Sequence, residues 1–221
     1  SHGRGVVVDS DLGIVLVDRA IVPVFMAIVH VVMGVARVPA RVLFVSPSST
    51  FALIQADLSG RSESGGLRLA DAIKAVHFGD DGVGLRDMTL ERKAAKKAGA
   101  KDAVWFLSLD ETGGITAAQD DVFQAAQNVA TALPEYAGQA FEAYRIVNTV
   151  GYGVMTEPGI AINAKGEIVA MISEVGGDSP LAVSAEWLKE PVTRVIRRIK
   201  EGTSATLSDL GVQLEFVALA D

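Results

Sequence analysis

The feature that most constrains the fold is a series of short, valine-rich segments separated at close intervals by turn residues. Residues 5–9 and 14–17 are two such segments, and Ser10 to Gly13 between them favours a turn, so the pair predicts a β-hairpin. Further strands are expected at residues 29–33, 38–45 and 51–56. This rhythm is typical of a small β-barrel or sandwich.

A second series of strands is expected in the other half of the chain. Its members are residues 103–109, 115–118, 141–148, 160–162 and 168–172. Residues 122–133 are ambiguous, because their alanines and glutamines favour a helix although a barrel would require a strand there. The prediction for this segment is helix or irregular structure.

One long helix is predicted near the end of the chain, at residues 184–200, with Gly202 ending it. Its apolar side chains recur at helical spacing, and the residues expected on the buried side are Trp187, Val192, Val195, Ile196 and Ile199. A shorter helix is expected at residues 90–98.

The composition excludes several classes of protein. At 221 residues, 49% hydrophobic and 21% charged, the chain can bury a sizeable core and is not disordered. The net charge of −7 argues against a general nucleic-acid partner. The absence of cysteine excludes disulfides and thiolate catalysis, but it does not indicate a compartment. The longest apolar run, residues 20–36, falls short of the roughly 20 residues of a membrane span.

Several segments, in order, carry a family resemblance. Residues 13–23 read Gly-Ile-Val-Leu-Val-Asp-Arg-Ala-Ile-Val-Pro, a turn, a buried strand and a tight bend. This resembles the HtrA/Deg family of trypsin-like serine proteases, in which glycine and an apolar pair precede threonine, two asparagines, histidine and two valines. Residues 40–55 are similar to the family segment containing Asp-Pro-x-x-Asp-Leu-Ala-Leu-Leu. Residues 158–172 resemble the segment that follows its Gly-Asn-Ser-Gly-Gly motif.

The resemblance implies an all-β fold, a chymotrypsin/trypsin-like double β-barrel with a C-terminal helix. The greatest likeness is to the degenerate second half of the tandem HtrA proteins of fungi and plants. Residues 207–220 look like the start of a PDZ domain, which follows the protease domain in HtrA proteins. The implied layout is an N-terminal barrel at 1–75, a linker and short helix at 76–102, a C-terminal barrel at 103–183, a helix at 184–202 and a truncated PDZ domain from 203 to 221.

The catalytic positions of the family hold other residues here. Serine-protease chemistry needs a hydroxyl nucleophile, an imidazole base and a carboxylate that orients the imidazole. The resemblance puts Ala20 at the position of the catalytic histidine, Thr50 at that of the aspartate and Glu157 at that of the serine. Thr156 is an alternative for the serine position. Pro158 has no N–H for an oxyanion hole.

The expected function is therefore that of a non-catalytic HtrA-like pseudoprotease domain, a structural or peptide-binding module of a larger PDZ-containing protein. One alternative is an active serine endopeptidase with a displaced triad. The candidate residues for that triad are Ser46, Ser48 and Ser49 with His77. The other is an oligomerisation module, because HtrA domains commonly form trimers. A protein or peptide partner and a homo-oligomer are both compatible with the resemblance.

No cofactor or metal is expected. His30 lies in an apolar strand and is interpreted as an outward-facing polar side chain. His77 is followed closely by Asp80 and Asp81, which could form a weak metal site, but a surface loop is the favoured interpretation. The run from Asp110 to Gly114 has too few spaced oxygen ligands for calcium and is interpreted as a hairpin turn.

Overall fold

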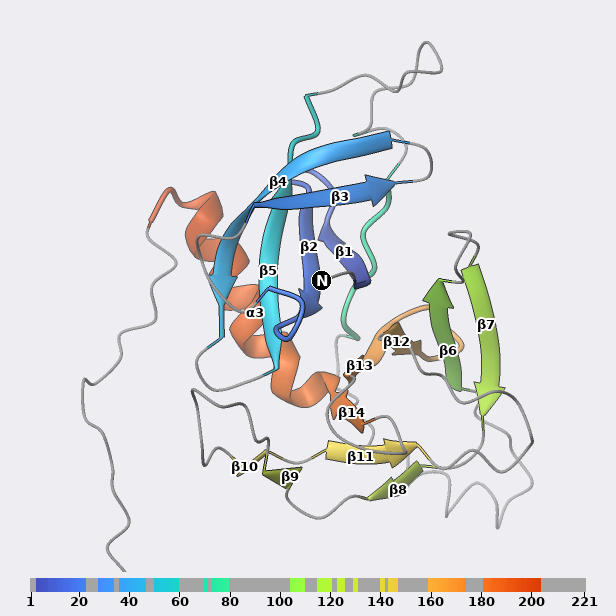
Figure 1. Ribbon diagram of the computed structural model, residues 1–221. Helices are drawn as coiled ribbons and strands as arrows, with labels where there is room; N and C mark the ends of the chain where they lie inside the picture. Colours follow the sequence, from blue (N-terminus) through green and yellow to red (C-terminus); the bar gives the residue numbers. More distant parts are fainter. Residues whose placement is uncertain are drawn as a thin grey trace, which may run out of the picture.

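The structure is a computed structural model of the whole chain. It describes residues 3–22, 28–33, 36–46, 50–59, 70, 73–79, 104–109, 115–120, 123–125, 129–130, 140–141, 143–146, 159–173 and 181–203. Within these residues the chain is mostly antiparallel β-sheet, with a helix against it (Figure 1).

The first half of the chain forms a five-stranded sheet in the order β1-β2-β5-β4-β3. The strands are β1 (Gly5–Asp9), β2 (Ile14–Asp18), β3 (Val29–Met33), β4 (Ala36–Val45) and β5 (Phe51–Ala56). The predicted hairpin of β1 and β2 is confirmed. Its turn contains Gly13, whose φ of 65° is a conformation that favours glycine.

The second half forms a seven-stranded sheet in the order β7-β6-β12-β13-β14-β11-β8. Its strands are β6 (Val104–Leu109), β7 (Ile115–Asp120), β8 (Phe123–Ala125), β11 (Ala143–Ile146), β12 (Gly159–Ile162), β13 (Ile168–Ser173) and β14 (Leu181–Ser184). A small separate ladder joins β9 (Val129–Ala130) to β10 (Ala140–Phe141). The sequence patterns did not predict β14.

The prediction of helix or irregular structure for residues 122–133 is wrong in part, because β8 and β9 lie there. β8 pairs with β11, and β9 pairs with β10. Backbone pairing with strands elsewhere in the chain outweighs the helical preference of alanine and glutamine, which is worth only tenths of a kcal/mol per residue.

A single apolar cluster joins the two sheets to the helix α3 (Ala185–Lys200). Leu16 and Phe51 come from the first sheet, Ile168 and Met171 from the second, and Leu188 from α3. The buried side of α3 consists of Ala185, Leu188, Val192 and Val195. Trp187 was expected on that side but is 52% exposed. It is adjacent to the buried Leu188 in sequence, and adjacent residues point in different directions around a helix, so the Trp187 side chain points away from the core.

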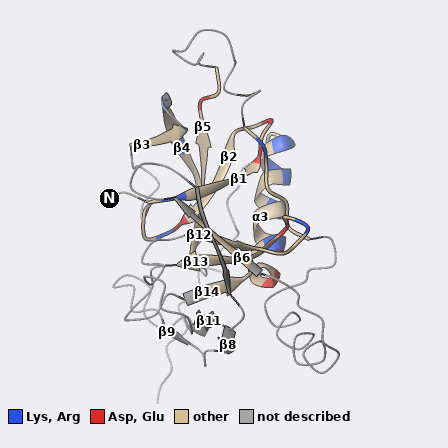
Figure 2. Cartoon of the chain, turned by 90° about the vertical axis from the view of Figure 1, so that its right-hand side faces the viewer, with Lys and Arg blue, Asp and Glu red and all other residues tan. Residues whose placement is uncertain are grey.

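Polar contacts also tie α3 to the rest of the chain. Lys200 Nζ lies 2.6 Å from Asp9 Oδ2, at the end of β1. Lys189 Nζ donates a hydrogen bond to the carbonyl oxygen of Gly79. Figure 2 shows several Lys and Arg positions along α3 in blue. Gly202 follows the helix with a φ of 67°, so the predicted helix end is confirmed.

Some predictions fall on residues that the structure does not describe. These are the helix at 90–98, the turn at 110–114 and the PDZ-like segment at 207–220. In the part of the chain that is described, no helix is long and apolar enough to cross a membrane.

Candidate functional site

The candidate site lies where β2 ends and β5 begins. Asp18 of β2 is paired with Phe51 of β5, and the N–H of Arg19 donates to the carbonyl oxygen of Thr50 at 2.7 Å. Ala20 therefore follows the end of β2 at the same end of the strand pair at which Thr50 precedes β5. The pairing brings together two positions that are thirty residues apart in the sequence.

The backbone bends tightly directly after β2, as the sequence predicted. Ile21 N–H donates to Asp18 O at 3.1 Å, and Val22 N–H donates to Arg19 O at 3.0 Å. The Asp18 carboxylate accepts the N–H of Ala20 at 2.7 Å, which holds the bend. Ala20 itself is exposed, so its methyl group faces outward at this bend.

Thr50 is buried, with 2% of its surface exposed. Its Oγ1 has no hydrogen-bond partner among the described residues. Leaving a buried hydroxyl without a partner costs free energy of folding.

Arg19 is a buried residue that sequence reasoning did not single out. Only 4% of it is exposed, and its Nη1 donates to the carbonyl oxygen of Ser46 at 2.5 Å. Ser46 N–H in turn donates to Phe51 O at 3.0 Å. Arg19 thus connects the bend after β2 to Ser46, which directly follows β4. No local signal identifies it, because its partner Ser46 is 27 positions away.

The chemistry available at this site is limited by its side chains. The methyl group of Ala20 cannot accept a proton, and the neutral hydroxyl of Thr50 cannot offset the charge of an imidazolium ion. The third predicted position, Glu157 or Thr156, and its neighbour Pro158 lie outside the described residues.

The structure separates His77 from Ser46, which is the candidate serine among the described residues. Val76 N–H donates to Val7 O at 2.8 Å, and Val7 is paired with Val15 of β2. The carbonyl oxygen of Ser46 instead accepts a hydrogen bond from Arg19. Arg19 is four residues beyond Val15, and four residues of extended chain span about 13 Å. This arrangement weighs against a catalytic pair of His77 and Ser46. The other candidate nucleophiles, Ser48 and Ser49, are not among the described residues.

The candidates for a metal site are only partly among the described residues. His30 is exposed on β3, as predicted. Asp80 and Asp81, which follow His77, are not described. Within the described ranges, no group of three or more His, Cys, Asp or Glu side chains could hold a metal ion.

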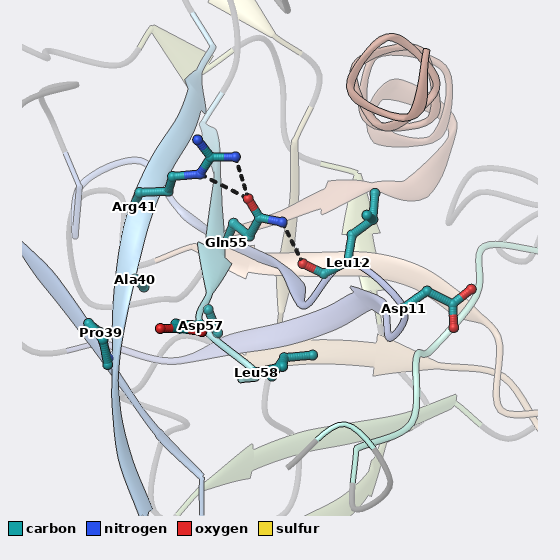
Figure 3. Close-up of a pocket in the computed structure, with 9 residues that line it drawn as sticks. Asp11, Leu12, Pro39, Ala40, Arg41, Gln55, Asp57 and Leu58 are labelled. Atoms are coloured by element: carbon teal, nitrogen blue, oxygen red, sulfur yellow. Dashed lines mark hydrogen bonds between the residues drawn. The ribbon is translucent and has the colours of Figure 1, made fainter. Parts of the chain in front are cut away.

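An open pocket of about 580 Å³ lies at the opposite end of β2 and β5 (Figure 3). Gln55 is central to it: its Oε1 accepts from Arg41 Nε at 2.9 Å and from Arg41 Nη2 at 2.7 Å, and its Nε2 donates to Leu12 O at 2.8 Å. β2 and β5 lie between this pocket and the bend at Ala20 and Thr50. The sequence offered no signal for the pocket.

Comparison with known proteins finds similarity in structure alone. No protein-family model and no curated protein matches the chain. The HtrA-type protease AlgW superposes with a TM-score of 0.52 at 14% identity, over 91% of this chain and 53% of the AlgW chain. The chain therefore has the fold of an HtrA-type protease.

Two further HtrA-fold neighbours agree with AlgW. The Rv3671c protease of M. tuberculosis has a TM-score of 0.52 at 16% identity, over 87% of this chain and 82% of its own. Deg5 has a TM-score of 0.50 at 13% identity, over 91% of this chain and 85% of its own. The expected trypsin-like double barrel with a C-terminal helix is therefore confirmed. At these identities the likeness concerns the fold, and this chain spans about half of the AlgW chain.

Proposed function

We propose that this chain is a non-catalytic domain of HtrA-type fold that serves as a structural or peptide-binding module of a larger, PDZ-containing protein. The observation that carries the proposal is the pairing of β2 with β5, which puts Ala20 and Thr50 at one end of the two strands. An HtrA-like protease needs its base and its orienting carboxylate next to each other, and here neither side chain can act in that way.

The size of the missing contribution supports inactivity. Loss of the nucleophile or the base of a serine-protease triad lowers the rate by a factor of about 10⁶, and loss of the carboxylate lowers it by about 10⁴. These losses are not additive, but either one removes useful turnover. A peptide-binding role is consistent with AlgW, which was solved with a decapeptide.

The direct test is labelling with a fluorophosphonate probe, followed by peptide mapping, beside an active HtrA protease. The proposal predicts no adduct on the folded chain and no hydrolysis of a casein substrate. A stoichiometric adduct on one serine would overturn it and would identify the nucleophile. The His77→Ala variant would then show whether His77 is the base.

A second test concerns the two assigned positions. We expect Thr50→Asp alone to destabilise the fold, because it buries a carboxylate without a partner. In the double variant Ala20→His/Thr50→Asp, the introduced imidazole should pair with the carboxylate, which recovers part of that loss. NMR titration should then show a higher pKa for this imidazole than in Ala20→His alone. Equal imidazole pKa values in the two variants would contradict the assignment of these two positions.

A further inference from the structure

β3 is an edge of the first sheet. Its residues pair with β4, in the register that joins Val29 to Ala40, His30 to Pro39 and Val31 to Val38, and the structure describes no strand on its other side. Edge strands carry a row of unpaired N–H and C=O groups, which can bind another extended chain. Figure 1 shows β3 beside β4, and in the strand order of the sheet β3 and β1 are the two outermost strands.

The register identifies which backbone groups of β3 have no partner in the sheet that the structure describes. Pro39 has no N–H, and its carbonyl oxygen accepts the N–H of Asp57 at 2.9 Å on the β5 side. His30 and Pro39 are therefore a non-hydrogen-bonded pair, and the backbone groups of His30 point away from β4. Because the pattern repeats every second residue, the N–H and C=O of Val32 point to the same free edge.

The side chains of β3 also favour a partner. Ile28, which directly precedes β3, is 92% exposed and Val32 on β3 is 66% exposed, whereas Val29 and Val31 are half-buried against an apolar cluster. That cluster consists of Val15, Val17, Val22, Ala52 and Ile54. β3 carries no lysine, aspartate, glutamate or proline, the residues that natural proteins place on edges to prevent pairing.

The other edge of the sheet is different. On β1 the carbonyl oxygen of Val7 already accepts a hydrogen bond from Val76 N–H. Val7 packs on the same apolar cluster as Val29 and Val31, so both edges of the curved sheet border one core. Because β1 and β3 border the same core, the edge at β3 is better suited to a single extended segment than to the wide sheet of a second folded copy.

We propose that the free edge of β3 binds one extended peptide segment by antiparallel strand addition. The segment is uncharged over about five residues, and its alternate side chains are apolar. Its N–H and C=O groups complement those of His30 and Val32, and its apolar side chains extend the cluster beside Val29 and Val31. This inference rests on the proposed role as a peptide-binding module and names its site and ligand class.

The test uses a fluorescein-labelled peptide, Lys-Val-Thr-Val-Thr-Val-Lys, with blocked termini. Its matched control is the same peptide N-methylated on both threonines, whose N–H groups would face β3. Hydrogen exchange of the whole chain should slow at the amides of His30 and Val32 when the unmodified peptide is added. The N-methylated peptide should bind at least about ten-fold more weakly.

The matched protein variants are His30→Pro and His30→Thr. His30→Pro removes a free-edge N–H but leaves the pairing with β4 intact, since His30 makes no ladder hydrogen bond to Pro39. It should keep the thermal midpoint within a few degrees and weaken peptide binding about ten-fold, whereas His30→Thr should bind as the parent does. Val32→Lys places a charge on the edge strand without removing an N–H, and it should weaken binding as well.

The outcomes separate the two proposals. Equal binding by His30→Pro and the parent, equal binding of both peptides, or no binding at millimolar concentration would each overturn strand addition at β3. Hydrolysis or fluorophosphonate labelling would overturn the non-catalytic role while leaving strand addition at β3 standing.

Discussion

Lys200 Nζ contacts Asp9 Oδ2 at 2.6 Å and so joins the last turn of α3 to the end of β1. Asp9 is buried, whereas the Lys200 side chain is about half exposed. Burial opposes ionisation of Asp9, but hydrogen bonds from Lys200 and from the N–H of Leu12 outweigh it, so the pKa of Asp9 is lowered. The hydrogen bond to Asp9 raises the pKa of Lys200.

Lys200→Met should lower the free energy of unfolding by about 1 kcal/mol, because a buried carboxylate loses its charged partner while solvent screens part of the loss. Arg194→Met is the matched control, since Arg194 pairs with Glu190 on the same helix but both side chains are exposed. It should show no measurable change. Urea unfolding of the two variants beside the parent checks this, and equal losses would contradict the role of the Asp9 contact.

The same contact makes stability depend on pH. The pKa of Asp9 is lower in the folded chain than its unfolded value of about 3.9, so its stabilising contribution is present above pH 4. The contribution is lost as pH falls through the folded pKa. Urea unfolding between pH 2 and 7 should show that Asp9→Asn loses less stability on acidification than the parent. Parallel curves would refute this.

Thr50→Val should leave the fold intact or stabilise it by up to about 1 kcal/mol. The change replaces a buried hydroxyl, which has no partner among the described residues, with a methyl group of similar size. Thr50→Ala is the comparison, because it leaves a cavity and should destabilise. A clear loss in thermal midpoint for Thr50→Val would show that the hydroxyl has a partner.

Leu188→Ala should cost about 3 kcal/mol, because Leu188 is fully buried in the cluster that joins α3 to both sheets. Its neighbour Trp187 is 52% exposed. Trp187→Ala removes the larger side chain yet should cost about 1 kcal/mol or less. Chemical denaturation of both variants measures the difference, and the reverse order would show that the helix is rotated.

Gly13→Ala should destabilise more than Gly166→Ala, although both glycines have positive φ. A Cβ on Gly13 would lie 2.8 Å from the carbonyl oxygen of Ala56, whereas a Cβ on Gly166 would meet nothing within 4 Å. We expect more than about 2 kcal/mol for Gly13→Ala and about 1 kcal/mol for Gly166→Ala. Urea midpoints test the ranking, and equal losses would mean that the turn at Gly13 can shift.

Local pattern predicted most strands well and failed where pairing decides the structure. Residues 29–33 and 51–56 are strands with the predicted bounds, because β-branched and aromatic residues gather there. β8 and β9, three and two residues long, are too short to show a period of their own. They exist because β11 and β10 pair with them.

For the candidate site, local sequence predicted the bend at Ala20 but not the burial of Arg19. An arginine beside a turn is ordinarily exposed, and what buries this one is a carbonyl group that only the folded chain brings near. The free edge of β3 was equally unpredictable, because an edge is defined by the strands that a strand does not contact.

The sequence by itself therefore determined the β-rich class, the hairpin of β1 and β2, the bend after β2 with its alanine, and the long C-terminal helix. Each of these depends on residues close together in the chain. The tertiary structure alone decided that Asp9 meets Lys200, that Arg19 meets Ser46 and that β3 is an edge. Those contacts join residues far apart in sequence, and their geometry follows from the packing of the whole core rather than from any local period.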